Sequence, residues 1–321
     1  MTNSCNSEGR PRKEETVSLI TMESEDNEST FSKDDYSVHM DGSTAASRPG
    51  FETEPWKTFA SFIYFLFAVF VTTFIESIVH DRLPDPEKYP PLPDIILDNV
   101  PLSPLAGTAS EVILVILGAT LVIVSVLHKH RMIIIRRFLC MVGTLYLLRD
   151  VTIGVTSLPE CGQGIPCTHE HEYTVQERLK LAFMTFVKLG LTSTGGRLCG
   201  AYIFSGHAMM MTNMAFFITE YTPKKLYALK VLSWVLCFSG MICVLASHGH
   251  YTVDVVLGFY ITYSMFVHYH SFASSRSIRK RFKWTKMWFP MLHFLESNAY
   301  GFVPNEFEWP FPRPHRIVQL F

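Results

Sequence analysis

Apolar segments about as long as a bilayer is thick constrain the fold of this chain more than any other feature. A transmembrane helix needs roughly 20 consecutive, mostly apolar residues. The 321-residue chain has such segments at residues 57–79, 108–128, 133–157, 201–219, 226–247 and 251–271. The sequence therefore predicts an all-α, polytopic membrane protein with six transmembrane helices.

Basic residues between these segments predict how the helices are oriented. They form three clusters, after the second, fourth and sixth segments: Lys129, Arg131, Arg136 and Arg137; Lys224, Lys225 and Lys230; Arg276, Arg279, Lys280, Arg281 and Lys283. Because positively charged loops tend to stay in the cytosol, all three clusters are expected there. With six spans, both termini are then cytosolic as well.

Composition divides the chain into three predicted parts. Residues 1–50 are rich in Ser, Thr, Glu and Asp and poor in aromatic residues, which predicts a disordered cytosolic tail. Residues 51–275 form the predicted six-helix membrane domain with the candidate catalytic site, and residues 276–321 form a basic cytosolic tail. The formal net charge of −1 gives no sign of a nucleic-acid-binding face.

The loop over residues 159–200 is expected on the lumenal or extracellular side. It contains Cys161, Cys167 and Cys199. Disulfides form in that compartment, but three cysteines leave their pairing open. Residues 179–196 are fairly apolar yet carry two lysines, which predicts a helix lying at the membrane interface.

Two histidines and an aspartate lie at the ends of apolar segments. His207 is near the start of the fourth segment, His250 at the end of the fifth and Asp254 at the start of the sixth. The predicted orientation places all three on the lumenal side at one depth, where titratable groups indicate a function. Residues four apart on a helix share a face, so Asp254 can orient His250 and strengthen its other nitrogen as a nucleophile or base.

Two other interpretations of these residues stay open. Interfacial imidazoles often bind only backbone carbonyls or water. Two imidazoles and a carboxylate are also adequate ligands for zinc or iron. An aspartate four residues after a histidine is better placed to orient that histidine than to share its metal, which favours a dyad without deciding the matter.

Nearby residues predict an anion site. Ser205 and Gly206 lie where a helix is expected to start, and the unpaired amides and dipole of a helix start favour an anion. Arg149 lies near the lumenal end of the third segment and can fork onto a phosphate, and Glu111 can hold this arginine or orient a histidine. The alternative for Arg149 is a side chain that only anchors its helix. Asp150 is expected to face water.

Several motifs between Trp56 and Pro314 give the chain a resemblance to a known family. They comprise Pro90-Pro91-Leu92-Pro93-Asp94, Ser110-Glu111, Leu148-Arg149, Thr156-Ser157-Leu158-Pro159, Cys199-Gly200, Phe204-Ser205-Gly206-His207, His250-Tyr251-Thr252-Val253-Asp254, Trp288-Phe289-Pro290, Val303-Pro304-Asn305-Glu306 and Trp309-Pro310-Phe311. On these motifs the chain resembles the sphingomyelin synthase family, itself similar to the lipid phosphate phosphatases. Its C-terminal motifs are most similar to the sphingomyelin synthase-related branch.

The resemblance implies transfer of phosphocholine or phosphoethanolamine from phosphatidylcholine or phosphatidylethanolamine to ceramide, with release of diacylglycerol. The family's catalytic residues map onto His207, His250 and Asp254. His250, held by Asp254, would form a phosphohistidine, while His207 protonates the departing oxygen and then deprotonates the ceramide hydroxyl. No metal, nucleotide or other cofactor is implied. The implied setting is lumenal or extracellular chemistry at the Golgi, endoplasmic reticulum or plasma membrane, and homo-oligomers stay open.

Three differences from the family pattern leave the head group and the activity open. Ala201 and Gly249 stand where acidic residues are usual, and no sterile-alpha-motif domain precedes the membrane core. Acidic groups would attract a cationic head group. A lipid phosphate phosphatase is an alternative, although Cys243 and Val244 stand where that superfamily usually has a Ser-Arg pair. A non-catalytic lipid-binding regulator is a further alternative, which Ala201 keeps open.

Overall fold

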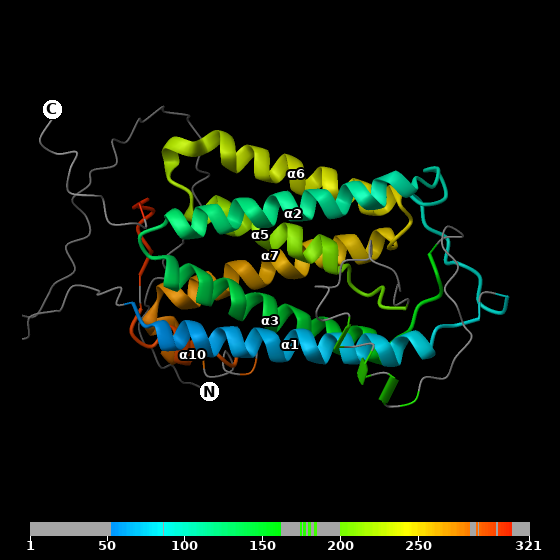
Figure 1. Cartoon of the computed structure of the whole chain (residues 1–321), viewed down its shortest axis with the longest axis horizontal. Helices are drawn as coiled ribbons and strands as arrows, with labels where there is room; N and C mark the ends of the chain where they lie inside the picture. The colour runs from blue at the N-terminus through cyan, green and yellow to red at the C-terminus, as the bar shows by residue number, and fades with distance from the viewer. Residues whose placement is uncertain are drawn as a thin grey trace, which may run out of the picture. The chain divides into compact units, whose positions relative to one another are not determined.

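Long helices form most of the part of the chain that the structure describes (Figure 1). The computed structural model describes residues 53–85, 87–161, 200–282, 287, 289–299 and 301–309, and scattered residues between 174 and 184. All of these belong to one compact unit, Ser47–Phe321. The long helices are α1 (Pro55–Asp81), α2 (Pro104–Leu127), α3 (Arg131–Val155), α5 (Gly206–Tyr221), α6 (Tyr227–Ala246) and α7 (Thr252–Ser274). Shorter ones are η2 (Lys224–Leu226), α8 (Arg276–Arg281) and α10 (Leu292–Leu295).

Each predicted apolar segment coincides with one long helix, so the all-α class is confirmed. By length and composition, α1, α2, α3 and the stretch Lys224–Ala246 can cross a membrane. Helix α5 has only 16 residues, and α7 has many Tyr, His and Ser residues, so these two do not meet the same criteria. The predicted interfacial helix at 179–196 lies mostly outside the described residues.

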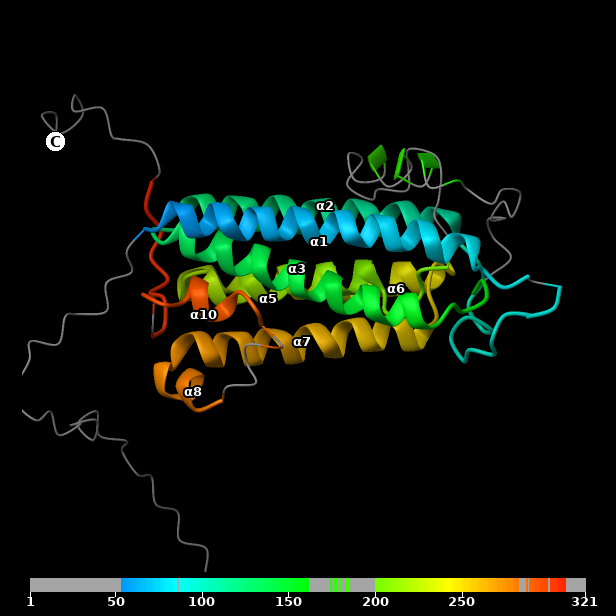
Figure 2. The same ribbon diagram turned by 90° about the horizontal axis from the view of Figure 1, so that it is seen from below.

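Helix α5 is the centre of the bundle, which explains its short length. It contacts α2, α3, α6 and α7, and both views place it inside the bundle (Figure 1, Figure 2). Its Met209, Ala215 and Phe217 side chains are fully buried. An outer helix must match the full thickness of the lipid. Helix α5 packs on protein on several sides, so it can be shorter.

The outer helices present apolar side chains to their surroundings. In the most apolar windows of α1, α2 and α6, only 28 % of the residues are buried. Large exposed side chains on these faces include Phe59, Phe67, Val115, Val122 and Ile242. Contiguous apolar surface of this extent is avoided in water and expected in lipid. The fold is therefore that of a polytopic helical membrane protein.

The two ends of the bundle differ in their chemistry. Helices α5 and α7 run parallel, as two contacts show. At their starts, the Ser205 N–H donates to the Asp254 carbonyl (3.1 Å). At their ends, the Tyr221 hydroxyl lies 3.0 Å from His270 Nε2. We call the end where α5 and α7 start the histidine end. The described residues of all three predicted basic clusters lie at the opposite end, which we call the basic end.

Described residues beyond position 275 pack against the basic end, where α8 and α10 lie in Figure 2. Glu296, fully buried, accepts from Arg137 Nε (2.9 Å) and Nη2 (2.7 Å), and its carbonyl accepts from Arg279 (2.6 Å). Burial would raise the pKa of Glu296, but the charges of Arg137, Arg136 and Arg279 hold this pKa below its usual value. The division at residue 275 stays a prediction.

Gly258 of α7 allows the start of α5 to pack closely, which leads to a testable prediction. A Cβ at this position would lie 3.0 Å from the Ser205 carbonyl oxygen and 3.3 Å from Ala208 Cβ. Because backbone cannot move aside easily, Gly258→Ala is expected to lower the free energy of unfolding by about 1–3 kcal/mol. Denaturant unfolding of the detergent-solubilised protein measures this change.

Gly154 of α3 provides the matched control for Gly258. A Cβ added there would meet only Ile75 Cγ2, at an ordinary distance of 4.0 Å. Gly154→Ala is therefore expected to leave stability unchanged or to raise it slightly. Equal unfolding curves for the two alanine variants would show that Gly258 does not set the spacing between α5 and α7.

Candidate active site

His250 lies just before α7, with one ring nitrogen held by the backbone. Its Nδ1 is 3.2 Å from the Tyr202 carbonyl oxygen and 3.9 Å from Asp254 Oδ2. Since a carbonyl only accepts hydrogen bonds, Nδ1 carries the proton in this contact and Nε2 has the lone pair. The nearer acceptor is thus the Tyr202 carbonyl, whereas the sequence predicted Asp254. Either partner leaves Nε2 as the nucleophilic nitrogen.

Asp254 is fully buried in the first turn of α7. Its Oδ2 accepts from the Tyr251 N–H (3.2 Å) and so caps the helix. Its Oδ1 is buried and has no hydrogen-bond partner among the residues that the structure describes. A buried carboxylate with an unused oxygen, 3.9 Å from His250, favours positive charge on that imidazole.

His207 occupies the second position of α5, also at the histidine end. Ser205 is the N-cap of this helix, and its hydroxyl oxygen accepts from the Ala208 N–H at 3.3 Å. Gly206 is the first helical residue and lies against Arg149, since an added Cβ would be 3.8 Å from Arg149 Cζ. The first turn of α5 thus places a histidine and a helix N-terminus beside the start of α7.

Arg149 is buried and contacts protein groups through all three guanidinium nitrogens. Nη1 pairs with Glu76 Oε1 at 2.6 Å, Nε donates to the Phe204 carbonyl (2.9 Å), and Nη2 donates to the Ala201 carbonyl (2.8 Å). The carboxylate beside Arg149 is therefore Glu76 of α1. Glu111, which the sequence offered for this role, lies half-buried in the first turns of α2.

Sequence reasoning missed Glu76 and misjudged Asp150. Glu76 is the only acidic residue of α1 besides Asp81, the last residue of the helix. An acidic side chain inside an apolar segment indicates a function, and this signal could have identified Glu76. The expectation that Asp150 faces water is wrong. Asp150 is 4 % exposed, and its Oδ2 accepts from Thr72 at 3.0 Å, because α1 packs along α3 and covers it.

The first loop at the histidine end holds the start of α7. Asp94 accepts from the Thr252 hydroxyl (2.6 Å) and the Thr252 N–H (2.7 Å). Burial would raise the pKa of Asp94, but the hydrogen bonds from Thr252, Ile96 and Leu97 hold it below its usual value. The Tyr251 hydroxyl donates to the Pro159 carbonyl and accepts from the Leu92 N–H, both at 3.2 Å. The proline-rich motif therefore fixes the residues that adjoin His250.

Asp94→Asn is expected to destabilise the protein by about 1 kcal/mol, the usual value of a helix cap. Since the folded-state pKa of Asp94 lies below 3.8, its stabilising effect is present above that pH and is lost as the pH falls further. Unfolding curves of the wild type and the variant between pH 3 and 7 (about the range where carboxylates titrate) should therefore converge at the acid end.

Asp85 lies in the same loop and serves as the control for Asp94. Its carboxylate is about half-exposed and lies 3.9 Å from Lys88. Asp85→Asn should leave the unfolding curve unchanged, since exposed pairs contribute little. A destabilisation equal to that of Asp94→Asn would contradict a special role for the contact with Thr252.

Two cavities open at opposite ends of the bundle. A cavity of about 290 Å³ at the histidine end is lined by residues that include Leu92, Asp94, Leu158, Tyr251 and Val253. This cavity adjoins the turn that carries His250. Among the residues that the structure describes, no group of three or more His, Cys, Asp or Glu side chains gathers as metal ligands.

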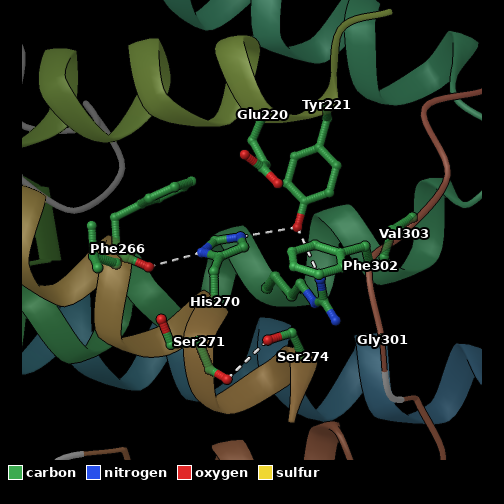
Figure 3. A pocket seen from close by; sticks show the side chains of 11 residues that line it. Glu220, Tyr221, Phe266, His270, Ser271, Ser274, Gly301, Phe302 and Val303 are labelled. Carbon is green, nitrogen blue, oxygen red and sulfur yellow. Dashed lines mark hydrogen bonds between the residues drawn. The ribbon is translucent and has the colours of Figure 1, made fainter. Parts of the chain in front are cut away.

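The second cavity, of about 250 Å³, lies at the basic end between α5, α7 and the C-terminal segment (Figure 3). Arg137 donates to the Tyr221 hydroxyl (3.1 Å), which lies 3.0 Å from His270 Nε2. His270 Nδ1 is 3.0 Å from the Phe266 carbonyl, so Nε2 accepts from Tyr221. These polar groups satisfy one another at the end of the bundle opposite to His207 and His250.

The cysteines of the loop before α5 are only partly described. Cys161 is buried, and its Sγ lies 3.1 Å from the His248 carbonyl oxygen. Cys167 and Cys199 lie outside the described residues. Any pairing among the three stays a prediction.

Comparison with known proteins first gives the class of the fold. Residues 198–271, which contain both histidines and Asp254, match the family model described as PAP2 superfamily C-terminal. The chain is 44 % identical to sphingomyelin synthase-related protein 1 of Homo sapiens over 282 residues, which cover 88 % of this chain and 68 % of that protein. The chain belongs to the sphingomyelin synthase family.

Two further relatives show how far the similarity extends. Sphingomyelin synthase-related protein 1 of Mus musculus is 44 % identical over 290 residues, or 90 % of this chain, although the match spans only 60 % of the length of that protein. Phosphatidylcholine:ceramide cholinephosphotransferase 1 of Homo sapiens is 36 % identical over 278 residues, with 85 % and 67 % covered.

Proposed function

We propose that this protein transfers a phosphocholine or phosphoethanolamine head group from phosphatidylcholine or phosphatidylethanolamine to ceramide. The observation that carries the proposal is the contact of His250 Nδ1 with the Tyr202 carbonyl at 3.2 Å, which places the proton on Nδ1 and the nucleophilic lone pair on Nε2. A relative named phosphatidylcholine:ceramide cholinephosphotransferase supports the substrate pair. The products are sphingomyelin or ceramide phosphoethanolamine, and diacylglycerol.

The first step forms a phosphohistidine. Nε2 of His250 attacks the phosphorus of the donor lipid, and the bond from phosphorus to the diacylglycerol oxygen breaks. Protonated His207 gives its proton to this leaving oxygen, so diacylglycerol departs as a neutral alcohol. Asp254, 3.9 Å from His250, stabilises the positive charge that develops on the imidazole.

The second step passes the head group to ceramide. His207, now neutral, removes the proton of the primary hydroxyl of ceramide as its oxygen attacks phosphorus. The bond from phosphorus to Nε2 breaks, which restores neutral His250 and protonated His207. The donor already holds a phosphodiester, so the proposed cycle uses no metal, nucleotide or other cofactor. Ser205 and Gly206 at the start of α5 are the proposed phosphate contacts.

The proposed setting follows from the charges at the two ends of the bundle. The basic end carries the three basic clusters and is proposed to be cytosolic, with both termini. The histidine end then faces the lumen of the Golgi or endoplasmic reticulum, or the outside of the cell. The lipid substrates reach it from the membrane.

A single reconstitution distinguishes the proposal from its alternatives. The full chain is made in a cell-free system with liposomes that contain labelled ceramide and either phosphatidylcholine, phosphatidylethanolamine or phosphatidic acid. Labelled sphingomyelin or ceramide phosphoethanolamine is the expected result. Free phosphate from phosphatidic acid would instead indicate a lipid phosphate phosphatase, and a folded protein without any product would indicate a non-catalytic regulator.

A further inference from the structure

The segment just before α5 is held by side chains through every carbonyl oxygen. Residues 201–204 form no helix. The carbonyls of Ala201 and Phe204 accept from Arg149 (2.8 and 2.9 Å), that of Tyr202 from His250 (3.2 Å) and that of Ile203 from Thr152 (2.8 Å). Two residues of α3, Arg149 and Thr152, therefore bind the three carbonyls that flank the one in contact with the imidazole.

Arg149 has a rigid partner of its own in this arrangement. Glu76 of α1 lies 2.6 Å from Nη1, and both side chains are largely buried, at 6 % exposure for Arg149 and 19 % for Glu76. The planar guanidinium is a fork of fixed geometry, so pairing one corner with Glu76 orients the other two. These two corners bind the first and last carbonyls of the segment.

The Tyr202 carbonyl belongs to the segment whose other carbonyls Arg149 and Thr152 bind. It lies between the peptide groups that Arg149 holds, so a shift of the guanidinium displaces it relative to His250. The same segment runs directly into Ser205, Gly206 and His207, so its position also sets the first turn of α5. One ion pair between α1 and α3 thus acts on both histidines.

We infer that Glu76 and Arg149 are positioning residues, which align His207 and His250 through the backbone of residues 201–204. This inference rests on the proposed function. In this role Arg149 does not bind the donor phosphate. A phosphate ligand would contribute to donor binding, whereas a positioning residue contributes to the chemical steps, because small errors in alignment slow them strongly.

Arg149→Lys is the informative variant, since lysine keeps the charge opposite Glu76 but cannot reach both carbonyls at once. In liposomes with phosphatidylcholine and labelled ceramide, kcat is expected to fall by about 10²-fold, with KM for phosphatidylcholine unchanged. Glu76→Gln should lower kcat less, because the amide oxygen still accepts from Nη1. Denaturant unfolding of each variant shows whether it is folded.

Arg82 is the matched control. It lies at the same end of the bundle, and its Nη1 donates to the Gly154 carbonyl of α3 at 2.9 Å, but it contacts no residue of the 201–204 segment in the hydrogen bonds that the structure describes. Arg82→Lys is expected to leave kcat and KM unchanged. A similar loss in Arg82→Lys would overturn the inference, because any arginine at this end would then matter.

Other outcomes separate the inference from the proposed function. A wild-type protein that forms no product contradicts the proposed function, and the inference with it. An active wild type with unchanged kcat in both Arg149→Lys and Glu76→Gln contradicts the inference alone. A raised KM for phosphatidylcholine with unchanged kcat in Arg149→Lys would assign Arg149 to the phosphate instead. If Arg149→Lys does not fold, Glu76→Gln decides between the same outcomes.

Discussion

His250→Ala is expected to reduce the formation of sphingolipid product by at least about 10³-fold, since a nucleophile that forms a covalent intermediate has no substitute. The residue precedes α7 and is not part of a helix, so the helices should remain folded. The measurement is the initial rate of labelled product in liposomes, at the same amount of folded protein.

His268 is the matched control for this variant. It lies on α7 near the basic end, is exposed, and uses Nδ1 to contact the Ser264 carbonyl of its own helix at 2.6 Å. His268→Ala should turn over like the wild type. Activity retained in His250→Ala would remove the phosphohistidine from the mechanism, whereas equal losses in both variants would point to a general effect of replacing a histidine.

Glu296→Gln is expected to cause the largest loss of stability, about 3–5 kcal/mol, because it leaves buried Arg137 without its counter-charge. The two hydrogen bonds of 2.9 and 2.7 Å between Arg137 and Glu296 form one buried bidentate pair. Arg136 Nε lies 4.0 Å from the same carboxylate. The folded-state pKa of Glu296 is below 4.5, so this stabilisation exists above that pH and is lost as the pH falls below it. Denaturant unfolding at neutral pH measures the difference.

Glu306 tests whether the effect of Glu296 comes from burial. It belongs to the same C-terminal segment and forms a 2.7 Å ion pair with Lys129, but both side chains are about half-exposed. Glu306→Gln is expected to leave the unfolding curve unchanged, because exposed ion pairs contribute little. Equal destabilisation by the two glutamine variants would mean that burial does not set the strength of these contacts.

The helices were predictable because lipid imposes its thickness on the sequence. The start of α5 shows the limit of this rule: hydropathy extends the segment back to residue 201, but the helix begins at Gly206. The carbonyls of residues 201–204 are bound by side chains from distant parts of the chain, and hydropathy carries no information about such partners.

The candidate site was predictable in its residue types and less so in its contacts. Charge patterning and the number of helices predicted that His207, His250 and Asp254 lie at one end of the bundle. In the structure, the contact between Ser205 and Asp254 joins the starts of the two helices that carry His207 and Asp254. The partner of His250 Nδ1 and the carboxylate beside Arg149 come from residues 48 and 73 positions away. Only the packed helices bring these groups together, whereas helical spacing favoured Asp254 and predicted depth in the membrane favoured Glu111.

The pairing of Arg137 with Glu296 has a consequence for biosynthesis. The two residues are 159 positions apart, so a ribosome that adds about 5–20 residues per second needs roughly 10 to 30 s between them. During this interval α3 must enter the membrane with an arginine whose final partner does not yet exist. The contact can therefore form only after Glu296 has been made, and a chain that stops before this residue would leave Arg137 without its carboxylate partner.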